Sequence, residues 1–281
     1  MRVLHTIADL RAALADSAAT ALVPTMGNLH DGHLSLVRLA RERGRPVVAS
    51  IFVNRLQFAP HEDFARYPRT FERDCGLLEE AGCDIVFAPD DREVYPEEQT
   101  YMVQPPAELA GILEGAVRPG FFAGVATVVT KLFNMVRPAA AVFGKKDYQQ
   151  LLIIERMVRQ LALPIEIVRA NTVRDPSGLA LSSRNGYLDA SQRRQASQLH
   201  AALDALAAAV RCGRNDWRTL ERRAFDQLQD EGWQPDYVAV RRRIDLSEPG
   251  SGATPAAPVA PLVVLAAARL GGTRLIDNVE I

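Results

Sequence analysis

The stretch ALVPTMGNLHDGH, Ala21–His33, decides the fold. Its opening apolar run predicts a β-strand, which Pro24 ends because proline has no N–H to donate to a neighbouring strand. Gly27 then frees the backbone to turn. Leu34 and Val37 follow at helical spacing, so a helix should begin at or just before the last histidine. The sequence therefore predicts a strand, a glycine-bearing loop and a helix in direct succession.

Two histidines stand at the start of that helix. His30 and His33 are separated by Asp31 and Gly32. Free backbone N–H groups and the positive end of the helix dipole should point outward here. An isolated His-x-x-His pair is more often a surface feature than a site. The strand before it and the glycine on each side favour a site for phosphate.

The composition is that of an ordinary globular protein. Among 281 residues, 48% are hydrophobic and 24% are charged, which argues against a disordered or fibrous chain. The net charge of −1 gives no reason to expect a nucleic acid or an anionic membrane surface as a partner. Any phosphate recognition must therefore depend on local charge.

The cysteines and the apolar runs indicate the compartment. Cys75, Cys83 and Cys212 form no C-x-x-C pair and leave one cysteine unpaired in any disulfide scheme, which predicts buried structural thiols in a reducing compartment. Acidic residues interrupt the N-terminal segment where a signal peptide would be apolar. The run Ala260–Ala268 is about half of the ~20 residues that a membrane crossing needs. We expect a soluble cytoplasmic protein.

Strands and helices alternate along residues 1–171. This alternation predicts an α/β protein with a Rossmann-like, doubly wound parallel sheet. The polar segment 55–70 should lie over the strand ends, where open parallel sheets bind ligands. The expected strands are 21–23, 46–54, 83–89, 139–144 and 164–171, with 100–106 as an edge strand or extended connection; the expected helices are 6–15, 33–44, 71–82 capped by Thr70, 107–114, 125–136 and 148–163, and 118–124 is an expected loop.

The pattern changes at Thr172, so the predicted domains are 1–171 and 172–281. The second is expected to be a smaller α+β domain that begins with a loop over 172–188. Helices are predicted at 191–210 and 217–231, strands at 236–242 and 261–270, and RLIDNVEI ends the chain. Segment 247–261, rich in Pro, Ala, Gly and Ser, is expected to be a mobile hairpin loop, and we assign it no function.

A second polar constellation, FGKKDYQQ, follows the strand predicted at 139–144. Lys145 and Lys146 could bind phosphate, and Asp147 could bind a ribose hydroxyl or a metal. Gln150 lies one helical turn beyond the aspartate, on the same face. This stretch alone is better explained as a solvated charged turn.

Two further stretches carry side chains suited to anions. In LSSRN, Ser182 and Ser183 can donate to phosphoryl oxygens, and the Arg184 guanidinium offers a bidentate fork. Serine-rich turns are common, so this signal is weak alone. In IFVNRLQF, Gln57 is a neutral amide that, like Gln150, can donate to a carboxylate or hydroxyl without acting as a base.

Four separated motifs in the same order resemble one family. PTMGNLHDGH is similar to the signature of the pantothenate synthetases (pantoate:beta-alanine ligases), members of the HxGH nucleotidyl-transfer superfamily. IFVNRLQF is similar to their pantoate-binding stretch, FGKKDYQQ matches their G-(E/K)-K-D-(F/Y)-Q-Q block, and LSSR resembles their mobile second nucleotide motif. The resemblance covers the chain to about Leu188 and, weakly, the C-terminal LIDN. Lys145 stands where many relatives carry Glu, and Arg55 where many carry Pro.

The resemblance implies an ATP-dependent ligase that condenses pantoate with β-alanine through an enzyme-bound pantoyl adenylate. It implies Mg²⁺ held mainly by the ATP phosphates, with no metal ligands of its own in the protein. A homodimer through the N-terminal domain, and a C-terminal lid carrying the LSSR loop, are also expected. The catalytic candidates are His30, His33, Lys146 and Arg184; the ATP-binding candidates add Met26, Gly27, Asn28, Leu29, Asp31, Gly32, Gly144, Lys145, Asp147, Val173, Leu181, Ser182 and Ser183; the pantoate and β-alanine candidates are Pro24, Met26, Asn54, Gln57, Phe58, Arg118 and Gln150.

Two other classes of protein remain as alternatives. A nucleotidylyltransferase would keep the nucleotide on a phosphate acceptor, and it would need more basic residues around the acceptor than Gln57 and Gln150 provide. A nucleotide-binding interaction module without turnover is disfavoured because the charged residues expected at the phosphates are all present. No reactive cysteine or serine nucleophile is apparent, and the two-step ligase reaction needs none.

Overall fold

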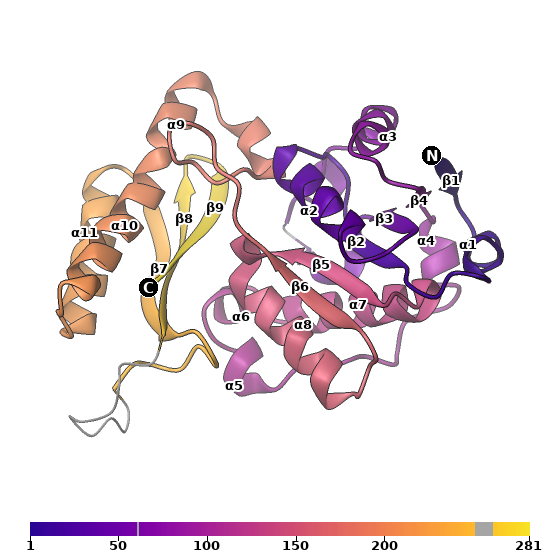
Figure 1. Ribbon diagram of the computed structural model, residues 1–281. Helices are drawn as coiled ribbons and strands as arrows, with labels where there is room; N and C mark the ends of the chain where they lie inside the picture. The colour runs from indigo at the N-terminus through magenta and orange to yellow at the C-terminus, as the bar shows by residue number, and fades with distance from the viewer. Residues whose placement is uncertain (61, 251–260) are drawn as a thin grey trace. The chain divides into compact units, whose positions relative to one another are not determined.

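The computed structural model describes residues 1–60, 62–250 and 261–281. The chain forms two compact units (Figure 1). Met1–Lys145 and Ile153–Asn171 form the first unit, and Lys146–Leu152 and Thr172–Ile281 form the second. The division passes through helix α8, Tyr148–Gln160. Most of the loop expected at 247–261 lies outside the described residues.

The first unit contains a six-stranded, wholly parallel sheet in the order β1-β4-β3-β2-β5-β6. From β2 the chain moves outward through β3 and β4, then returns to place β5 on the other side of β2. The order therefore reverses between β2 and β5, and the doubly wound α/β fold expected from the sequence is confirmed. The strands are β1 Arg2–Leu4, β2 Ala21–Thr25, β3 Val47–Ile51, β4 Ile85–Phe87, β5 Ala140–Gly144 and β6 Glu166–Ala170.

Helices complete the first unit. Leu34 and Val37 of α2 and Leu78 of α3 pack with strand residues such as Val23 and Val142 in one buried cluster. The helices are α1 Ile7–Leu14, α2 Asp31–Arg41, α3 Phe71–Glu80, α4 Asp91–Val94, α5 Ala107–Ala110, α6 Glu114–Val117, α7 Phe121–Val136 and α8, with short 3₁₀ turns η1 Arg55–Gln57, η2 Asp63–Arg66 and η3 Lys145–Asp147.

Strand β2 does not end at Pro24 as the sequence suggested. Pro24 pairs with Ser50 of β3, and the strand continues to Thr25. Pairing with β5 ends earlier, at Leu22 and Ala141. Pro24 therefore lies beyond the ladder with β5, where its missing N–H interrupts no hydrogen bond on that side.

Helix α7 begins at Phe121, four residues before the predicted start at Val125, so part of the expected 118–124 loop is helical. Gly124, which suggested a loop boundary, is instead needed for packing. A Cβ at this position would lie 2.1 Å from the carbonyl oxygen of Leu56 in η1. The glycine therefore lets a helix approach the segment that carries Gln57.

Other local expectations also need correction. Strand β1 was not predicted. Of the two alternatives for 100–106, the structure has the connection and not the edge strand. The helix expected at 107–114 is interrupted between α5 and α6, where Leu113 has φ +49°. Thr70 precedes α3, but its hydroxyl donates to Asp74 at 3.0 Å instead of capping the helix.

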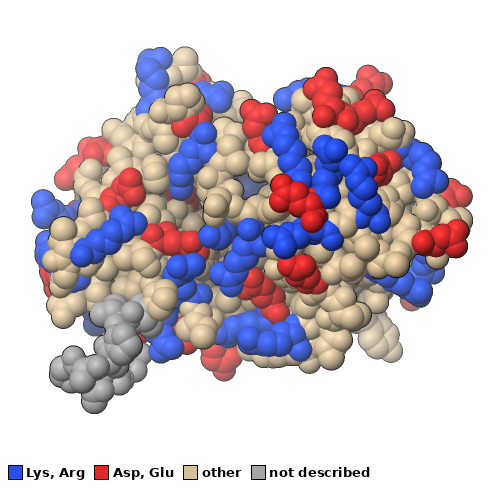
Figure 2. Space-filling view, viewed as in Figure 1, with Lys and Arg blue, Asp and Glu red and all other residues tan. Residues whose placement is uncertain are grey.

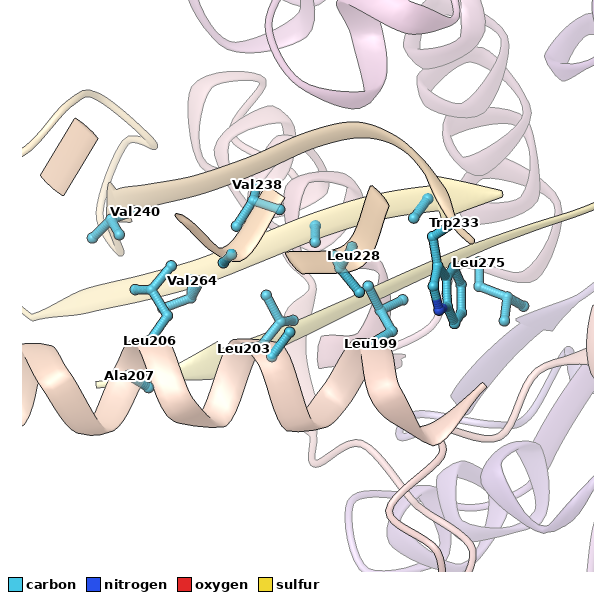
Figure 3. Packing of buried hydrophobic residues seen from close by; sticks show 14 of the residues in the cluster. Leu199, Leu203, Leu206, Ala207, Leu228, Trp233, Val238, Val240, Val264 and Leu275 are labelled. Carbon is cyan, nitrogen blue, oxygen red and sulfur yellow. The ribbon is translucent and has the colours of Figure 1, made fainter. Parts of the chain in front are cut away.

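The second unit is an antiparallel sheet in the order β7-β8-β9, packed against helices. Leu199, Leu203 and Leu206 project from α10 into a buried cluster with strand residues such as Val238 and Val264 (Figure 3). The helix predicted over 191–210 is divided near Ala196. The elements are η4 Ser183–Tyr187, α9 Ala190–Gln195, α10 Ser197–Arg211, α11 Trp217–Asp230, β7 Gln234–Arg242, β8 Leu262–Leu270 and β9 Thr273–Glu280.

The three cysteines are free thiols in different environments. Cys83 is buried, which raises its pKa to about 11, and Cys75 is half-buried. Cys212 is exposed, so the expectation of buried thiols is wrong for this residue.

On the face drawn in Figure 2, Lys and Arg are interspersed with Asp and Glu. None of the described helices combines the length and apolar character needed to cross a membrane.

Candidate functional site

The first half of the candidate site is the loop between β2 and α2. Helix α2 begins at Asp31, two residues before His33, and His30 is its N-cap. The His30 Nδ1 accepts the Gly32 N–H at 3.1 Å, and the His33 Nδ1 accepts the His30 N–H at 3.4 Å. The histidines thus form a reciprocal capping box, a role usually taken by Ser or Thr with Glu.

This cap determines which nitrogen of each imidazole carries the proton. A ring nitrogen that accepts a backbone N–H bond cannot itself be protonated. The Nδ1 atoms of His30 and His33 are therefore unprotonated, and each neutral ring carries its proton on Nε2. The ring centroids lie 4.1 Å apart. The two rings therefore lie close together at the start of α2.

A buried carboxylate organises the loop before the cap. Asp74, from α3, is fully buried and accepts the N–H groups of Asn28 at 2.8 Å and Leu29 at 2.9 Å. The φ of Gly27 is +82°, and a Cβ there would lie 3.1 Å from the same carboxylate. The N–H groups of Asn28 and Leu29 therefore point to this carboxylate, and the Gly32 N–H at the helix start, which was expected to point outward, is accepted by His30. The Asn28 and Leu29 N–H groups are therefore engaged inside the loop.

Gln57 lies beside this loop within the same unit. Its Nε2 donates to the Met26 sulfur at 3.0 Å, and its Oε1 accepts from Asn54 at 3.1 Å. Asn54 is 1% exposed and also donates to the Gly124 carbonyl at 3.1 Å. Its Oδ1 accepts the Tyr95 hydroxyl at 2.6 Å. Asn54 therefore fixes the amide of Gln57 from inside the protein.

Other residues predicted on the pantoate side lie in the same unit as Gln57. Arg118 forms a two-point ion pair with Glu62 at 2.7 and 2.8 Å and donates to the Gln57 carbonyl at 3.1 Å. Phe58 packs edge-on against Phe64 with centroids 5.3 Å apart. Half-buried Pro24 lies on β2, next to the loop. The structure thus brings Pro24, Met26, Asn54, Gln57, Phe58 and Arg118 into one unit.

The motif FGKKDYQQ is divided between the units. Gly144 and Lys145 belong to the first unit, at the end of β5, the strand beside β2. Lys146, Asp147 and Gln150 belong to the second. Asp147 is exposed, whereas the lysines and Gln150 are half-buried.

The serine and arginine motif follows an ordered turn in the second unit. Val173 accepts the Leu181 N–H at 2.9 Å, which closes the segment between them. Inside it, Asp175 accepts from the Ser177 backbone and hydroxyl at 2.9 and 2.6 Å. Ser182 then caps the short helix η4 by accepting the Arg184 N–H at 3.3 Å. Ser182 also lines a small pocket together with Lys146. Parts of the FGKKDYQQ and LSSR motifs therefore meet within this unit.

Sequence reasoning missed two buried aspartates, Asp74 and Asp277. Asp277 on β9 accepts the guanidinium of Arg174 at 2.6 and 2.8 Å. Burial alone would raise the pKa of Asp277, but the neighbouring His200 and Arg174 outweigh it and the pKa lies below the usual value. Asp277 stands inside an apolar strand sequence, a signal that could have identified it. Asp74 lies on an amphipathic helix among other acidic residues, where no local pattern distinguishes it.

Comparison with known proteins gives one consistent result. Residues 2–280 match the family model described as Pantoate-beta-alanine ligase. The chain is 62% identical over 287 aligned residues to a pantothenate synthetase of Leptothrix cholodnii, and the match covers 100% of both chains.

Solved structures agree. A pantothenate synthetase of Thermus thermophilus is 47% identical with a TM-score of 0.92, and the match covers 100% of this chain and 99% of that one. A pantoate-beta-alanine ligase of Francisella tularensis, described as complexed with beta-gamma ATP and beta-alanine, is 30% identical with a TM-score of 0.82. That match covers 100% of this chain and 97% of the relative.

Proposed function

The chain belongs to the pantoate-beta-alanine ligase family and joins pantoate to β-alanine with cleavage of ATP, and we propose how its residues divide this work. In the first step the pantoate carboxylate attacks the α-phosphorus of ATP, which gives pantoyl adenylate and pyrophosphate. In the second, the β-alanine amine attacks the acyl carbon and AMP leaves. Neither step needs a covalent bond to the enzyme. The protein must place the carboxylate and stabilise negative charge on the phosphates.

We propose that His30 and His33 act as neutral donors to phosphoryl oxygens through Nε2–H. The observation that carries this proposal is that both Nδ1 atoms accept backbone N–H groups. Because the cap fixes ring orientation and tautomer before ATP arrives, the donors need no reorganisation as charge develops. Gly27, Asn28, Leu29, Asp31 and Gly32 would contribute by shaping the loop around them.

The positive charge that acts on the phosphates is assigned to the FGKKDYQQ and LSSR motifs. Lys146 and Arg184 would neutralise phosphate charge, and Ser182 and Ser183 would donate hydroxyl hydrogen bonds. The shared pocket of Lys146 and Ser182 supports their acting on one ligand. Gly144, Lys145, Asp147, Val173 and Leu181 are proposed to contact the remainder of ATP. A lid role for residues 172–281 stays a prediction.

We propose that Gln57 and Gln150 bind pantoate through their amides. Gln57 is already oriented by Asn54 and lies against Met26, so its amide can donate to a carboxylate or hydroxyl without a further rearrangement. Pro24, Met26 and Phe58 would supply the apolar surface for the methyl groups. The buried contacts of Asn54 favour a role through Gln57, and the pairing of Arg118 with Glu62 favours a similar indirect role.

Magnesium is proposed to enter with ATP. Within the described part of the chain, no group of three or more His, Cys, Asp and Glu side chains converges on a metal-sized site. Mg²⁺ commonly binds through substrate phosphates with few carboxylates, and the exposed Asp147 carboxylate could supply one. Bound there, the ion would neutralise charge on the β- and γ-phosphates. A homodimer and a cytoplasmic location also stay predictions.

The first experiment measures pyrophosphate release from MgATP with and without pantoate, followed by addition of β-alanine while AMP is monitored. The ligase requires pantoate for pyrophosphate release and β-alanine for AMP turnover. Pyrophosphate release that needs a phosphorylated acceptor instead would indicate a nucleotidylyltransferase.

The residue assignments are tested in the same assay. His33→Ala and Lys146→Ala should each lower the rate of pyrophosphate release by roughly 100-fold, the effect of removing one donor to developing charge. Either variant with a wild-type rate would remove that residue from the mechanism.

A further inference from the structure

Strand β9 joins the two motifs of the second unit that are proposed to bind phosphate. Asn278 is 6% exposed, and its Nδ2 donates to the main-chain carbonyl of Lys146 at 2.9 Å. These residues are 132 positions apart in the sequence. The carbonyl lies in η3, directly before α8. A hydrogen bond at this point fixes the backbone from which the Lys146 amino group extends.

The neighbouring residue on β9 holds the other motif. Both carboxylate oxygens of Asp277 accept from Arg174, which also donates to the carbonyls of Gly178 at 3.0 Å and Asn278 at 3.2 Å. One guanidinium thus ties the turn that precedes LSSR to the strand. Asp277 is 4% exposed, so the tie is made inside the unit.

The two attachments meet at one place. Lys146, Ser182 and Asp277 line the same small pocket, and the Asn185 side chain, which lines it too, donates to the Ala180 carbonyl at 3.0 Å. Two motifs that are far apart in the sequence therefore share consecutive residues of one strand as their support.

We infer that Asn278 is a positioning residue for adenylation. It fixes the Lys146 backbone relative to the LSSR loop, and Asp277 and Arg174 hold that loop to the same strand. This inference rests on the proposed phosphate role of Lys146. Asn278 would act only through Lys146 in the first step. Attack of β-alanine on preformed pantoyl adenylate, which involves no triphosphate, should not depend on it.

The chain offers a matched control two residues along the same strand. Glu280 accepts the Tyr148 hydroxyl at 3.1 Å and the Arg243 guanidinium at 2.8 Å. This contact also attaches the start of α8 to β9, but to a side chain rather than to the lysine backbone. Tyr148→Phe removes only the hydroxyl. Phenylalanine is the other residue that the family motif has at this position.

The experiment compares Asn278→Asp with the wild type in two reactions: pyrophosphate release from MgATP and pantoate, and pantothenate formation from supplied pantoyl adenylate and β-alanine. Asn278→Asp keeps the size of the side chain but places an acceptor against the carbonyl. We expect pyrophosphate release to fall about tenfold, the effect of one lost hydrogen bond, with the change in kcat rather than in the KM for pantoate. The second reaction should be unchanged. Tyr148→Phe should match the wild type in both.

Each outcome decides between explanations. Equal losses in both reactions would show a merely structural role, and an unchanged rate of pyrophosphate release would show that Lys146 does not need Asn278; either overturns the inference. If Asn278→Asp does not fold, Asn278→Ala, which lacks the repulsive oxygen, takes its place. Lys146→Ala is measured in parallel. Loss with Lys146→Ala but not with Asn278→Asp refutes only this inference, whereas no loss with Lys146→Ala refutes the proposed role of the lysine.

Discussion

The two units each support a candidate phosphate-binding loop with a buried aspartate, but the partners differ. Asp74 in the first unit accepts three neutral donors, the N–H groups of Asn28 and Leu29 and the hydroxyl of Thr70. Asp277 in the second unit accepts the charged fork of Arg174. Dipoles stabilise a carboxylate without requiring a second charge to be buried. An ion pair leaves an uncompensated charge when one partner is removed. The second unit should therefore be the more sensitive to neutralisation of its aspartate.

The largest expected effect is on the second unit. Asp277→Asn leaves Arg174 largely buried without its anion and should lower the free energy of unfolding by about 3 to 5 kcal/mol. Denaturant unfolding monitored by circular dichroism measures it. Asp204→Asn is the matched control, because Asp204 is exposed and its contact with His200 is 3.9 Å long. A similar small change in both variants would contradict the asymmetry.

The same pair predicts a pH dependence. Because the pKa of Asp277 is lowered in the folded protein, its contribution to stability is complete above the unfolded pKa of about 3.9 and is lost as the pH falls through the lowered folded value. In Asp277→Asn this part of the acid destabilisation should be absent. Unfolding midpoints measured between neutral and acidic pH test it; parallel profiles for the variant and the wild type would refute it.

Substitution of His30 can separate its capping role from its proposed role as a donor to phosphate. Asparagine is a favoured N-cap, so His30→Asn should retain the bond to the Gly32 N–H while it removes the Nε2–H donor. Pyrophosphate release should fall roughly 100-fold at unchanged stability. His30→Ala should lose the same activity and also about 1 kcal/mol of stability. An active His30→Asn variant would show that His30 serves only as a cap.

The neutral arrangement around Asp74 predicts a smaller loss than at Asp277. Asp74→Asn replaces one acceptor oxygen by an amide donor, so one loop N–H loses its partner at a cost of about 2 kcal/mol. The Thr70 hydroxyl can rotate to accept from the new amide. Thermal unfolding of Asp74→Asn beside Thr70→Val measures the two contributions. A loss as large as that of Asp277→Asn would show that dipoles and an ion pair are equivalent supports here.

The contrast also shows what the sequence could reveal. The alternation of apolar runs and helical periods predicted the parallel sheet, because these signals are local. The motifs with His30, Lys146 and Ser182 were visible for the same reason. The supports of these motifs were not visible: Asp74 acts 46 residues from Asn28, and Asn278 acts 132 residues from Lys146. Their function depends on contacts that exist only in the folded chain.

Local rules failed where tertiary contacts override them. Pro24 ended the predicted strand because proline lacks an N–H, yet pairing on one side only lets β2 continue to Thr25. Gly124 suggested a loop, yet its missing side chain admits the Leu56 carbonyl to a helix surface. The expectation of outward N–H groups at the helix start failed at Gly32, because the His30 ring already accepts its N–H.

The smallest expected effect concerns pantoate. It shows whether the first unit binds pantoate and ATP through different residues. Gln57 contacts Met26 in the loop between β2 and α2 but receives its orientation from Asn54. Gln57→Ala should raise the KM for pantoate about tenfold, the effect of one or two lost hydrogen bonds, and leave ATP affinity and stability unchanged. Asn54→Ala should weaken pantoate binding and also destabilise the fold, because it removes a buried centre of four hydrogen bonds. Steady-state kinetics with each substrate varied, together with ATP binding by calorimetry, distinguish the two variants. A selective loss of ATP affinity in Gln57→Ala would place this amide at the nucleotide. The first unit would then not separate pantoate binding from ATP binding.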